Sequence, residues 1–193
     1  PMMFHDWDDV DAVREKLRPD LERRLNEAGY VVMFWADAGW VRYFSNKPIQ
    51  RFQDLKSLRV YASSGDPESV NLMKSYYTPV VLEPDQILLG LRNGMIDALP
   101  VPAFFANFSQ IPTYAPYMLD LRWAPITGAL VLTRRAWDKL DPAAQSWLRE
   151  TSERAGNEMR RASRAEDAQA VRAMKDNMGR KVVAMMAEAA RGW

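Results

Sequence analysis

An alternation of strand-like and helix-like segments between Ser45 and Pro102 limits the possible folds of this chain more than any other feature. Three apolar runs with strand character enclose two segments with helix character: 58–62, 78–82 and 96–101 for the strands, and 68–76 and 85–92 for the helices. Strands that are separated by helices favour a parallel sheet with crossover helices. The fold class is therefore α/β.

A helix and an extended segment precede this region. Residues 8–28 carry apolar side chains at spacings of three and four and end before Gly29. This pattern predicts an amphipathic helix, which Pro19 should kink or divide. The continuous apolar run 30–35 predicts a strand that is buried on both faces, and residues 39–44 continue it in extended form.

Two strands and one long helix are expected in the C-terminal third. The strands cover 117–121 and 128–133, with a bend at 123–125, and the helix begins at Asp141 and runs to about Asn177. A helix of this length exceeds one small lobe, so we expect it to cross between two. Its apolar stripe is interrupted by charge and consists of Ala144, Leu148, Thr151, Ala155, Met159, Ala162, Val171, Met174 and Met178.

Composition excludes several classes of function. The chain has 193 residues, with 26 Lys plus Arg against 25 Asp plus Glu, so no global field steers it to nucleic acid or to an anionic membrane. It has no cysteine and a single histidine, His5, which leaves no thiolate site, imidazole cluster or hydrolytic triad. We therefore expect neither a metal nor a cofactor. The first residues lack the pattern of a signal peptide, and we expect the chain to be part of a longer protein.

Three motifs carry a resemblance to a known family. They are Phe-Ser-Asn-Lys-Pro-Ile at 44–49, Asp-Leu-Lys-Ser-Leu-Arg-Val at 54–60, and Gly-Leu-Arg-Asn-Gly-Met-Ile-Asp at 90–97. A strand that ends at Thr133 and the long helix from Asp141 follow them. In this order and spacing, the motifs resemble the substrate-binding proteins of tripartite ATP-independent periplasmic (TRAP) transporters, the dicarboxylate-binding-protein family. The resemblance covers nearly the whole chain.

The resemblance implies a fold and a function. The fold would be an incomplete two-lobe solute-binding fold, with a mixed sheet, flanking helices and a long helix that spans both lobes. Residues 1–37 would belong to the first lobe, 38–132 would form the second lobe, and 133–193 would form the bridging helix and a returning segment. Such a protein works in the periplasm, binds a small solute by lobe closure, and delivers it to the membrane subunits of the transporter. We expect this solute to be a carboxylate.

One departure from the family pattern concerns the ligand. The family's motif has an arginine that pairs with the ligand carboxylate, and Tyr61 stands at that position here, while Ser57 stands in place of a glycine. A phenol offers one donor and no positive charge, so it does not replace the planar fork of arginine. Arg42 and Arg122 are the candidates to replace this cation, with an ordinary surface charge as the alternative for each.

Aromatic and polar residues complete the candidate ligand site. The aromatic side chains would either line a cleft, because binding pockets are mostly apolar with a few placed polar groups, or belong to the core. They are Trp40, Tyr61, Phe104, Phe105 and Trp123, of which Trp40 and Tyr61 are the best candidates for the cleft. Asn107, within a short aromatic helix expected at 103–110, would bond the ligand or a neighbouring loop. The amides of residues 63–65 either bind an anion before the next helix or form an ordinary capping turn.

Three functional hypotheses remain open on the sequence alone. The first is the solute-binding component of a TRAP-type transporter. The second is a ligand-sensing or interaction module that has lost the usual arginine, and such a chain could dimerise through the long helix. The third is an enzyme, but the carboxylates show no pairing, and no phosphate loop or nucleophile motif organises them, so we expect no catalysis.

Overall fold

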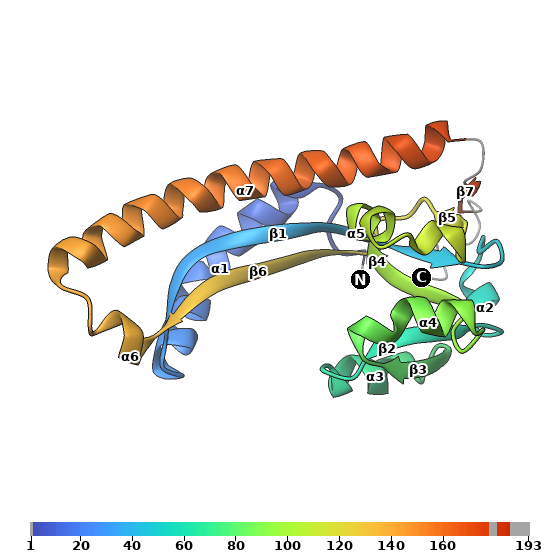
Figure 1. Ribbon diagram of the computed structural model, residues 1–193, viewed down its shortest axis with the longest axis horizontal. Helices are drawn as coiled ribbons and strands as arrows, with labels where there is room; N and C mark the ends of the chain where they lie inside the picture. The colour runs from blue at the N-terminus through green and yellow to red at the C-terminus, as the bar shows by residue number, and fades with distance from the viewer. Residues whose placement is uncertain (1, 178–180, 186–193) are drawn as a thin grey trace. The chain divides into compact units, whose positions relative to one another are not determined.

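The computed structural model describes residues 2–177 and 181–185, and it divides them into two compact units (Figure 1). Unit 1 consists of residues 3–39 and 125–166. Unit 2 consists of Met2, residues 40–124 and the described residues from Asp167 onward. From residue 3 onward, the chain therefore passes between the units three times. The lobe boundaries expected at residues 37 and 132 stay a prediction.

The sheet of unit 2 is mixed. Its strands follow the order β3-β2-β4-β1-β5-β7, with β2 parallel to both β3 and β4, β1 antiparallel to both β4 and β5, and β5 parallel to β7. The alternation of helix and strand therefore predicts the parallel arrangement correctly for β2, β3 and β4 alone. The strands are β1 (Tyr30–Ser45), β2 (Arg59–Ser63), β3 (Thr78–Leu82), β4 (Ala98–Pro102), β5 (Tyr117–Leu119) and β7 (Lys181–Val183).

Short helices and one end of a long helix cover this sheet. They are α2 (Phe52–Leu55), α3 (Pro67–Met73), η1 (Pro84–Gln86), α4 (Ile87–Arg92), α5 (Ala103–Phe108), η2 (Ile111–Thr113) and the C-terminal part of α7 (Pro142–Asp176). Gly94 follows α4 with φ of +66°, so it is the helix end that the sequence predicts. Two cores lie on the two faces of the sheet, because successive strand residues point to opposite sides.

We call these faces the α7 face and the α2 face of unit 2. On the α7 face, Phe44, Tyr61 and Met118 pack with Ala170, Val171 and Met174 of α7. The α2 face holds their sequence neighbours, which pack with α2 and the segments around it: Tyr43, Val60 and Leu119. The strands β1, β2, β4 and β5 thus contribute to both cores, whereas β3 and β7 contribute to the core of the α7 face.

Unit 1 contains α1 (Trp7–Glu27), the first part of β1, β6 (Ala124–Thr133), α6 (Arg134–Trp137) and the first part of α7. The side chain of Asp6 caps α1 by accepting the N–H of Asp9 at 3.0 Å. Pro19 lies inside α1, which continues as one helix, so the predicted division is wrong. The predicted bend at 123–125 is also wrong, because β6 begins at Ala124 and pairs with β1.

Burial in β1 and α7 differs from the apolar pattern of the sequence. In the first part of β1, Val31 and Met33 are buried, Tyr30 is exposed, and residues 32 and 34–36 are half-buried. This part of β1 is therefore not a strand buried on both faces. On α7, the predicted stripe residues Ala155, Met159 and Ala162 are exposed, whereas Ser152 and Gly156 are buried. Among the described residues, no helix combines the length and the apolar composition that crossing a membrane requires.

Gly156 explains the buried face of α7 in unit 1. A Cβ atom at this position would lie 2.5 Å from Cβ and 2.7 Å from Cγ of Phe34 in β1. These distances are far below van der Waals contact, so only a glycine lets α7 approach β1 this closely. The contact depends on the absence of a side chain, which hydrophobic periodicity does not reveal.

We expect Gly156→Ala to lower the free energy of unfolding by about 1–3 kcal/mol, because the helix must move away from Phe34. Helix propensity alone predicts the opposite sign, a gain of about 1 kcal/mol. Urea denaturation measures the difference. The control is Gly128→Ala on β6, where an added Cβ meets no atom within 4 Å. A stabilised Gly156→Ala variant would contradict the close contact.

Candidate functional site

A buried carboxylate on α7 organises the α7 face of unit 2. Asp167 is 3% exposed, and its Oδ2 accepts a hydrogen bond from Nη1 of Arg42 at 3.3 Å. The same carboxylate accepts the backbone N–H of Trp40 at 3.2 Å and, through Oδ1, that of Ala103 at 3.0 Å. Asp167 thus joins α7 to β1 and to the start of α5.

Arg42 lies within this cluster. It is 5% exposed, and Nη1 also donates to the carbonyl oxygen of Trp40 at 3.1 Å. Its Nε atom is buried and has no hydrogen-bond partner in the part of the chain that the structure describes. Burial lowers the pKa of the Arg42 guanidinium, and the charge of Asp167 partly offsets this effect. A bound carboxylate at Arg42 would compete with a carboxylate that the protein itself supplies.

Trp40 and Arg122 lie beside this ion pair. Trp40 is 3% exposed, whereas Arg122, between β5 and β6, is exposed. The Cζ atom of Arg122 lies 5.6 Å from the centroid of the Trp40 ring, within the range of a cation–π contact. The positive charge of Arg122 also contributes to the lowered pKa of Arg42. The structure therefore brings Trp40, Arg42 and Arg122 together.

The other three predicted site residues are more dispersed. Tyr61 is buried on the α7 face, and Asn107 is exposed on α5. Trp123 packs with the core of the α2 face, where its ring meets that of Tyr43 edge-on at 5.5 Å and 72°. Tyr61 and Trp123 consequently lie on opposite faces of the sheet, so the two rings do not form one wall.

The backbone N–H groups of the turn before α3 donate hydrogen bonds within the protein. The N–H groups of Ser64, Gly65 and Asp66 donate to the Leu82 carbonyl, the Ser63 hydroxyl and the Ser63 carbonyl, at 3.4, 3.3 and 3.2 Å respectively. Of the two alternatives open at these residues, this geometry supports the ordinary capping turn.

Asp97, which matches a family aspartate, is bound by a neighbouring strand. Its carboxylate accepts hydrogen bonds from Nε and Nη2 of Arg59 at 2.8 and 2.9 Å. It also accepts hydrogen bonds from the backbone N–H of Arg59 and from the side-chain amide of Asn46, both at 3.0 Å. The side-chain hydrogen bond from Arg59 is the main cause that lowers the pKa of Asp97 to about 2. Asp97 thus has a structural role before β4, where it joins the segment to β2.

A second buried carboxylate organises unit 1. The side chain of Asp37 in β1 is fully buried between Arg14 of α1 at 3.2 Å and Arg164 of α7 at 2.7 Å. Arg164 also binds Asp11, and its Cζ lies 4.5 Å from the centroid of the Trp7 ring. The cluster ties α1, β1 and α7 together. Among the described residues, no group of three acidic or histidine side chains is placed to hold a metal ion.

The sequence analysis did not identify Asp167 or Arg164 as important residues. The buried position of Asp167 could have been inferred from its spacing on the helix. Asp167 lies three, four and seven residues before the buried residues Ala170, Val171 and Met174. This spacing places a charge on the apolar side of the helix. A charged residue in such a position needs a buried partner, and Arg42 supplies it.

The chain is similar to one known family over its full length. The sequence model named DctP, described as bacterial extracellular solute-binding protein, family 7, matches residues 1–193. The chain belongs to this family. DctP-family members are extracellular solute receptors and not enzymes.

Solved structures with bound solutes share the fold of this DctP-family chain. A TRAP periplasmic solute-binding protein from Haemophilus influenzae RdAW with bound L-gulonate has a TM-score of 0.91 at 16% identity, and the match covers 99% of this chain and 63% of that one. DctP6 of Bordetella pertussis, a receptor that binds pyroglutamic acid, has a TM-score of 0.90 at 21% identity, with 100% and 63% covered. A TRAP periplasmic solute-binding protein from Pseudomonas aeruginosa PAO1 with bound L-malate has a TM-score of 0.88 at 15% identity. This match covers 100% of this chain and 68% of that one.

These likenesses confirm the predicted fold class, a mixed α/β sheet with flanking helices in the periplasmic solute-binding-protein fold. The chain spans about 63% of the length of the first two solved relatives. What those proteins bind is a property of each of them.

We expect Asp167→Asn to lower the free energy of unfolding by about 3–5 kcal/mol, because Arg42 then keeps a buried charge without a counter-ion. Adding Arg42→Met should recover part of this loss, because it removes the buried charge that has lost its counter-ion. Urea denaturation of the single and double variants measures the coupling. Glu166→Gln, at the exposed neighbouring position, is the control and should change stability by less than about 0.5 kcal/mol. Equal losses in Asp167→Asn and Glu166→Gln would contradict the buried pair.

The lowered pKa of Asp97 predicts how the stability of the protein changes in acid. Its folded pKa of about 2 lies below its ordinary value of 3.8, so its stabilising contribution is complete above pH 4 and is lost as the pH falls toward 2. Asp97→Asn should therefore cost about 1–2 kcal/mol at pH 7 and almost nothing at pH 2. Thermal unfolding of both proteins across this range measures the difference. A constant difference between pH 7 and pH 2 would exclude the ionised pair as its cause.

Proposed function

We propose that this chain is the solute-binding part of a TRAP-type transporter, which captures a small organic acid in the periplasm and passes it to the membrane subunits. The family match over residues 1–193 supports a solute-binding role. The solved relatives hold gulonate, galacturonate, malate and pyroglutamic acid, all of which carry a carboxylate. Closure of two lobes over the solute stays a prediction from the resemblance.

The placement of Arg122 is the observation that best supports carboxylate binding. Its guanidinium is exposed and lies over the buried Trp40 ring, so a flat surface limits its orientations. A planar guanidinium offers paired N–H donors that match the two oxygens of a carboxylate. Arg42 is already neutralised by Asp167, so we propose that it holds Trp40 in place and that Arg122 provides the positive charge for the solute.

The remaining predicted residues have supporting roles in this proposal. The Tyr61 phenol and the Asn107 amide are hydrogen-bonding groups for the hydroxyl or keto groups of the solute. Trp123 is adjacent to Arg122 in sequence and is anchored against Tyr43. We propose that it positions the backbone that carries Arg122.

The second candidate function is an interaction or sensing module without solute binding. Two observations favour it: Tyr61 replaces the family's arginine, and the nearby Arg42 is occupied by Asp167. Such a module could dimerise through α7, and sedimentation velocity would detect the dimer. Solute binding separates the two candidates, because only the first requires it.

We expect organic acids to raise the melting temperature of the chain, since a ligand at 100 times its Kd adds about 2.7 kcal/mol to the free energy of unfolding. The panel contains malate, gulonate, galacturonate and pyroglutamate, with neutral sugars as the negative set. Arg122→Ala should weaken the best binder by about tenfold or more. In the free chain it should lower the free energy of unfolding by only about 0.5–1 kcal/mol, the value of an exposed cation–π contact. Arg92→Ala, an exposed arginine on α4, is the matched control.

Two results would contradict this proposal. If no acid shifts the melting temperature, the module hypothesis is favoured. If Arg122→Ala binds the acid as tightly as the Arg92→Ala control, the cation for the solute lies elsewhere, and a titration of Arg42→Met is the next measurement.

A further inference from the structure

The chain leaves the carboxyl ends of the neighbouring strands β2 and β4 in opposite directions. The strand β2 lies between β3 and β4 and is parallel to both. From β2 the chain runs through α3 to β3, whereas from β4 it runs through α5 and η2 to β5, on the far side of β1. Ligands of open α/β sheets bind outside the carboxyl ends of two such strands, because the diverging connections leave space there.

Tyr61 lies near the carboxyl end of β2, and its hydroxyl has no partner within the described part of the chain. The side chain belongs to the core of the α7 face and is 8% exposed. A tyrosine that is buried to this degree usually has a hydrogen-bond partner. Among the described residues, the fully buried side-chain nitrogen and oxygen atoms without a partner are Nε of Arg14 and Nε of Arg42. The Tyr61 oxygen is not one of them, so it reaches the surface.

Ser63 adds a second hydroxyl at the same end of β2. The two residues are two positions apart in the strand, so both side chains point to the α7 face. Ser63 is half-buried, and its hydroxyl accepts the N–H of Gly65 at 3.3 Å. A hydroxyl that accepts one hydrogen bond still has its own hydrogen to donate. This end of β2 therefore presents two uncharged hydrogen-bonding groups.

Apolar side chains of the neighbouring elements surround these hydroxyls. In the register of the two strands, β3 places one apolar residue beside Tyr61 and another beside Ser63. The apolar residues at these strand ends are Val80 and Leu82 of β3, Val101 of β4, and Phe104 and Phe105 of α5, and all of them pack in or against the core of the α7 face. A ligand group at this place would therefore meet hydroxyls and carbon.

The arginines of β1, β2 and β4 already bind carboxylates of the protein itself. Arg59, at the start of β2, binds both oxygens of Asp97 at 2.8 and 2.9 Å. Arg42 of β1 binds Asp167 at 3.3 Å. A solute carboxylate beside Tyr61 would have to displace one of these internal partners before it gained an arginine.

The segments that follow β2 and β3 carry negative charge. Asp66 and Glu68 follow β2, Glu83 and Asp85 follow β3, and all four are exposed. Lys74 is the one basic residue between positions 64 and 86. These charges would repel a carboxylate at the strand ends, but they would not repel a neutral carbonyl or hydroxyl group.

We propose that the carboxyl ends of β2 and β4 bind an uncharged carbonyl or hydroxyl group of the solute, so that the chain prefers acids with one carboxylate to dicarboxylates. The Tyr61 hydroxyl determines this specificity, because it bonds an oxygen of the solute without adding a positive charge. The inference rests on the proposed function, in which Arg122 binds the carboxylate of the same solute.

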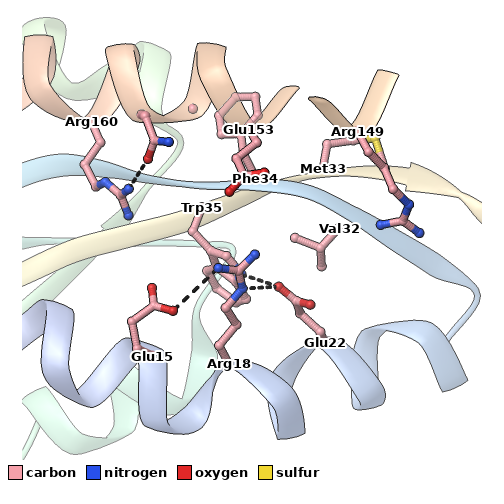
Figure 2. A pocket seen from close by; sticks show the side chains of 12 residues that line it. Glu15, Arg18, Glu22, Val32, Met33, Phe34, Trp35, Arg149, Glu153 and Arg160 are labelled. Atoms are coloured by element: carbon pink, nitrogen blue, oxygen red, sulfur yellow. Dashed lines mark hydrogen bonds and ion pairs between the residues drawn. The ribbon is translucent and has the colours of Figure 1, made fainter. Parts of the chain in front are cut away.

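A groove in unit 1 is another place where arginines could bind an acid. It has a volume of about 170 Å³, and its lining includes three acidic and three basic side chains. Figure 2 shows Arg18 between Glu15 and Glu22, which it binds at 3.5 and 2.7 Å. Because these charges balance one another, the groove offers no net positive charge. Arg18→Ala is therefore a control that should leave the affinity for the solute unchanged.

Calorimetric titration with matched acids tests the preference. Succinate, succinamate and 4-oxopentanoate share one carboxylate and differ at the other end, which is a second carboxylate, a primary amide or a methyl ketone. Gulonate and glucarate form a second pair for longer solutes. We expect succinamate, 4-oxopentanoate and gulonate to bind about tenfold or more tightly than the matched dicarboxylate.

Substitutions of Tyr61 test its role. Tyr61→Phe should weaken the best monocarboxylate by about three- to tenfold and leave the melting temperature of the free chain nearly unchanged, because the ring remains. Tyr43→Phe is the matched control, since the Tyr43 hydroxyl lies 3.4 Å from that of Tyr77 on the α2 face. It should lower the melting temperature and leave the affinity unchanged. Tyr61→Arg should shift the preference toward dicarboxylates by about tenfold or more.

Two results would overturn the inference while the proposed function stands. They are a dicarboxylate that binds as tightly as its matched monocarboxylate, and an unchanged affinity in Tyr61→Phe. If Tyr61→Arg fails to fold, the wild-type titrations and Tyr61→Phe still decide. If no acid of either kind binds, the proposed function fails and this inference fails with it.

Discussion

The Asp167 carboxylate is the interaction on which the α7 face of unit 2 depends. A buried carboxylate is costly unless it is fully hydrogen-bonded, and Asp167 meets this requirement with one guanidinium and two backbone N–H groups. Those three donors belong to β1 and α5, so a single side chain fixes the positions of both elements against α7. The location of Trp40, and through its ring that of Arg122, follows from this arrangement.

The two units use opposite charges on α7 for the same purpose. In unit 1, Arg164 of α7 binds Asp37 of β1, and in unit 2, Asp167 of α7 binds Arg42 of β1. The two α7 residues are less than one turn apart, and the two β1 residues are five positions apart. Each pair joins α7 to β1 within its own unit, and each contains a buried carboxylate that is costly without its partner.

The sequence predicted the secondary structure well where elements are local. Thr78–Leu82 is a strand with the expected bounds, and α7 ends one residue before the expected Asn177, because both depend on local pattern and on strong turn or cap signals. The antiparallel direction of β1, the close contact at Gly156 and the exposure of Met159 were not predictable, because they depend on neighbours far away in sequence. For the site, the sequence named Trp40, Arg42 and Arg122 as candidates, and the structure places them close together. The partner of Arg42 was not predictable, because it lies 125 residues away on a helix.

The division of each unit among distant parts of the chain determines when it can fold during synthesis. Unit 1 needs residues 3–39 together with 125–166, and unit 2 needs Asp167 and the helical residues after it. Nascent α1 and β1 must therefore wait for more than 80 further residues before β6 is available, at roughly 5–20 residues per second. During these seconds β6 cannot yet pair with the apolar run from Tyr30 to Trp35. The length of this delay is set by chain topology and not by the stability of the finished fold.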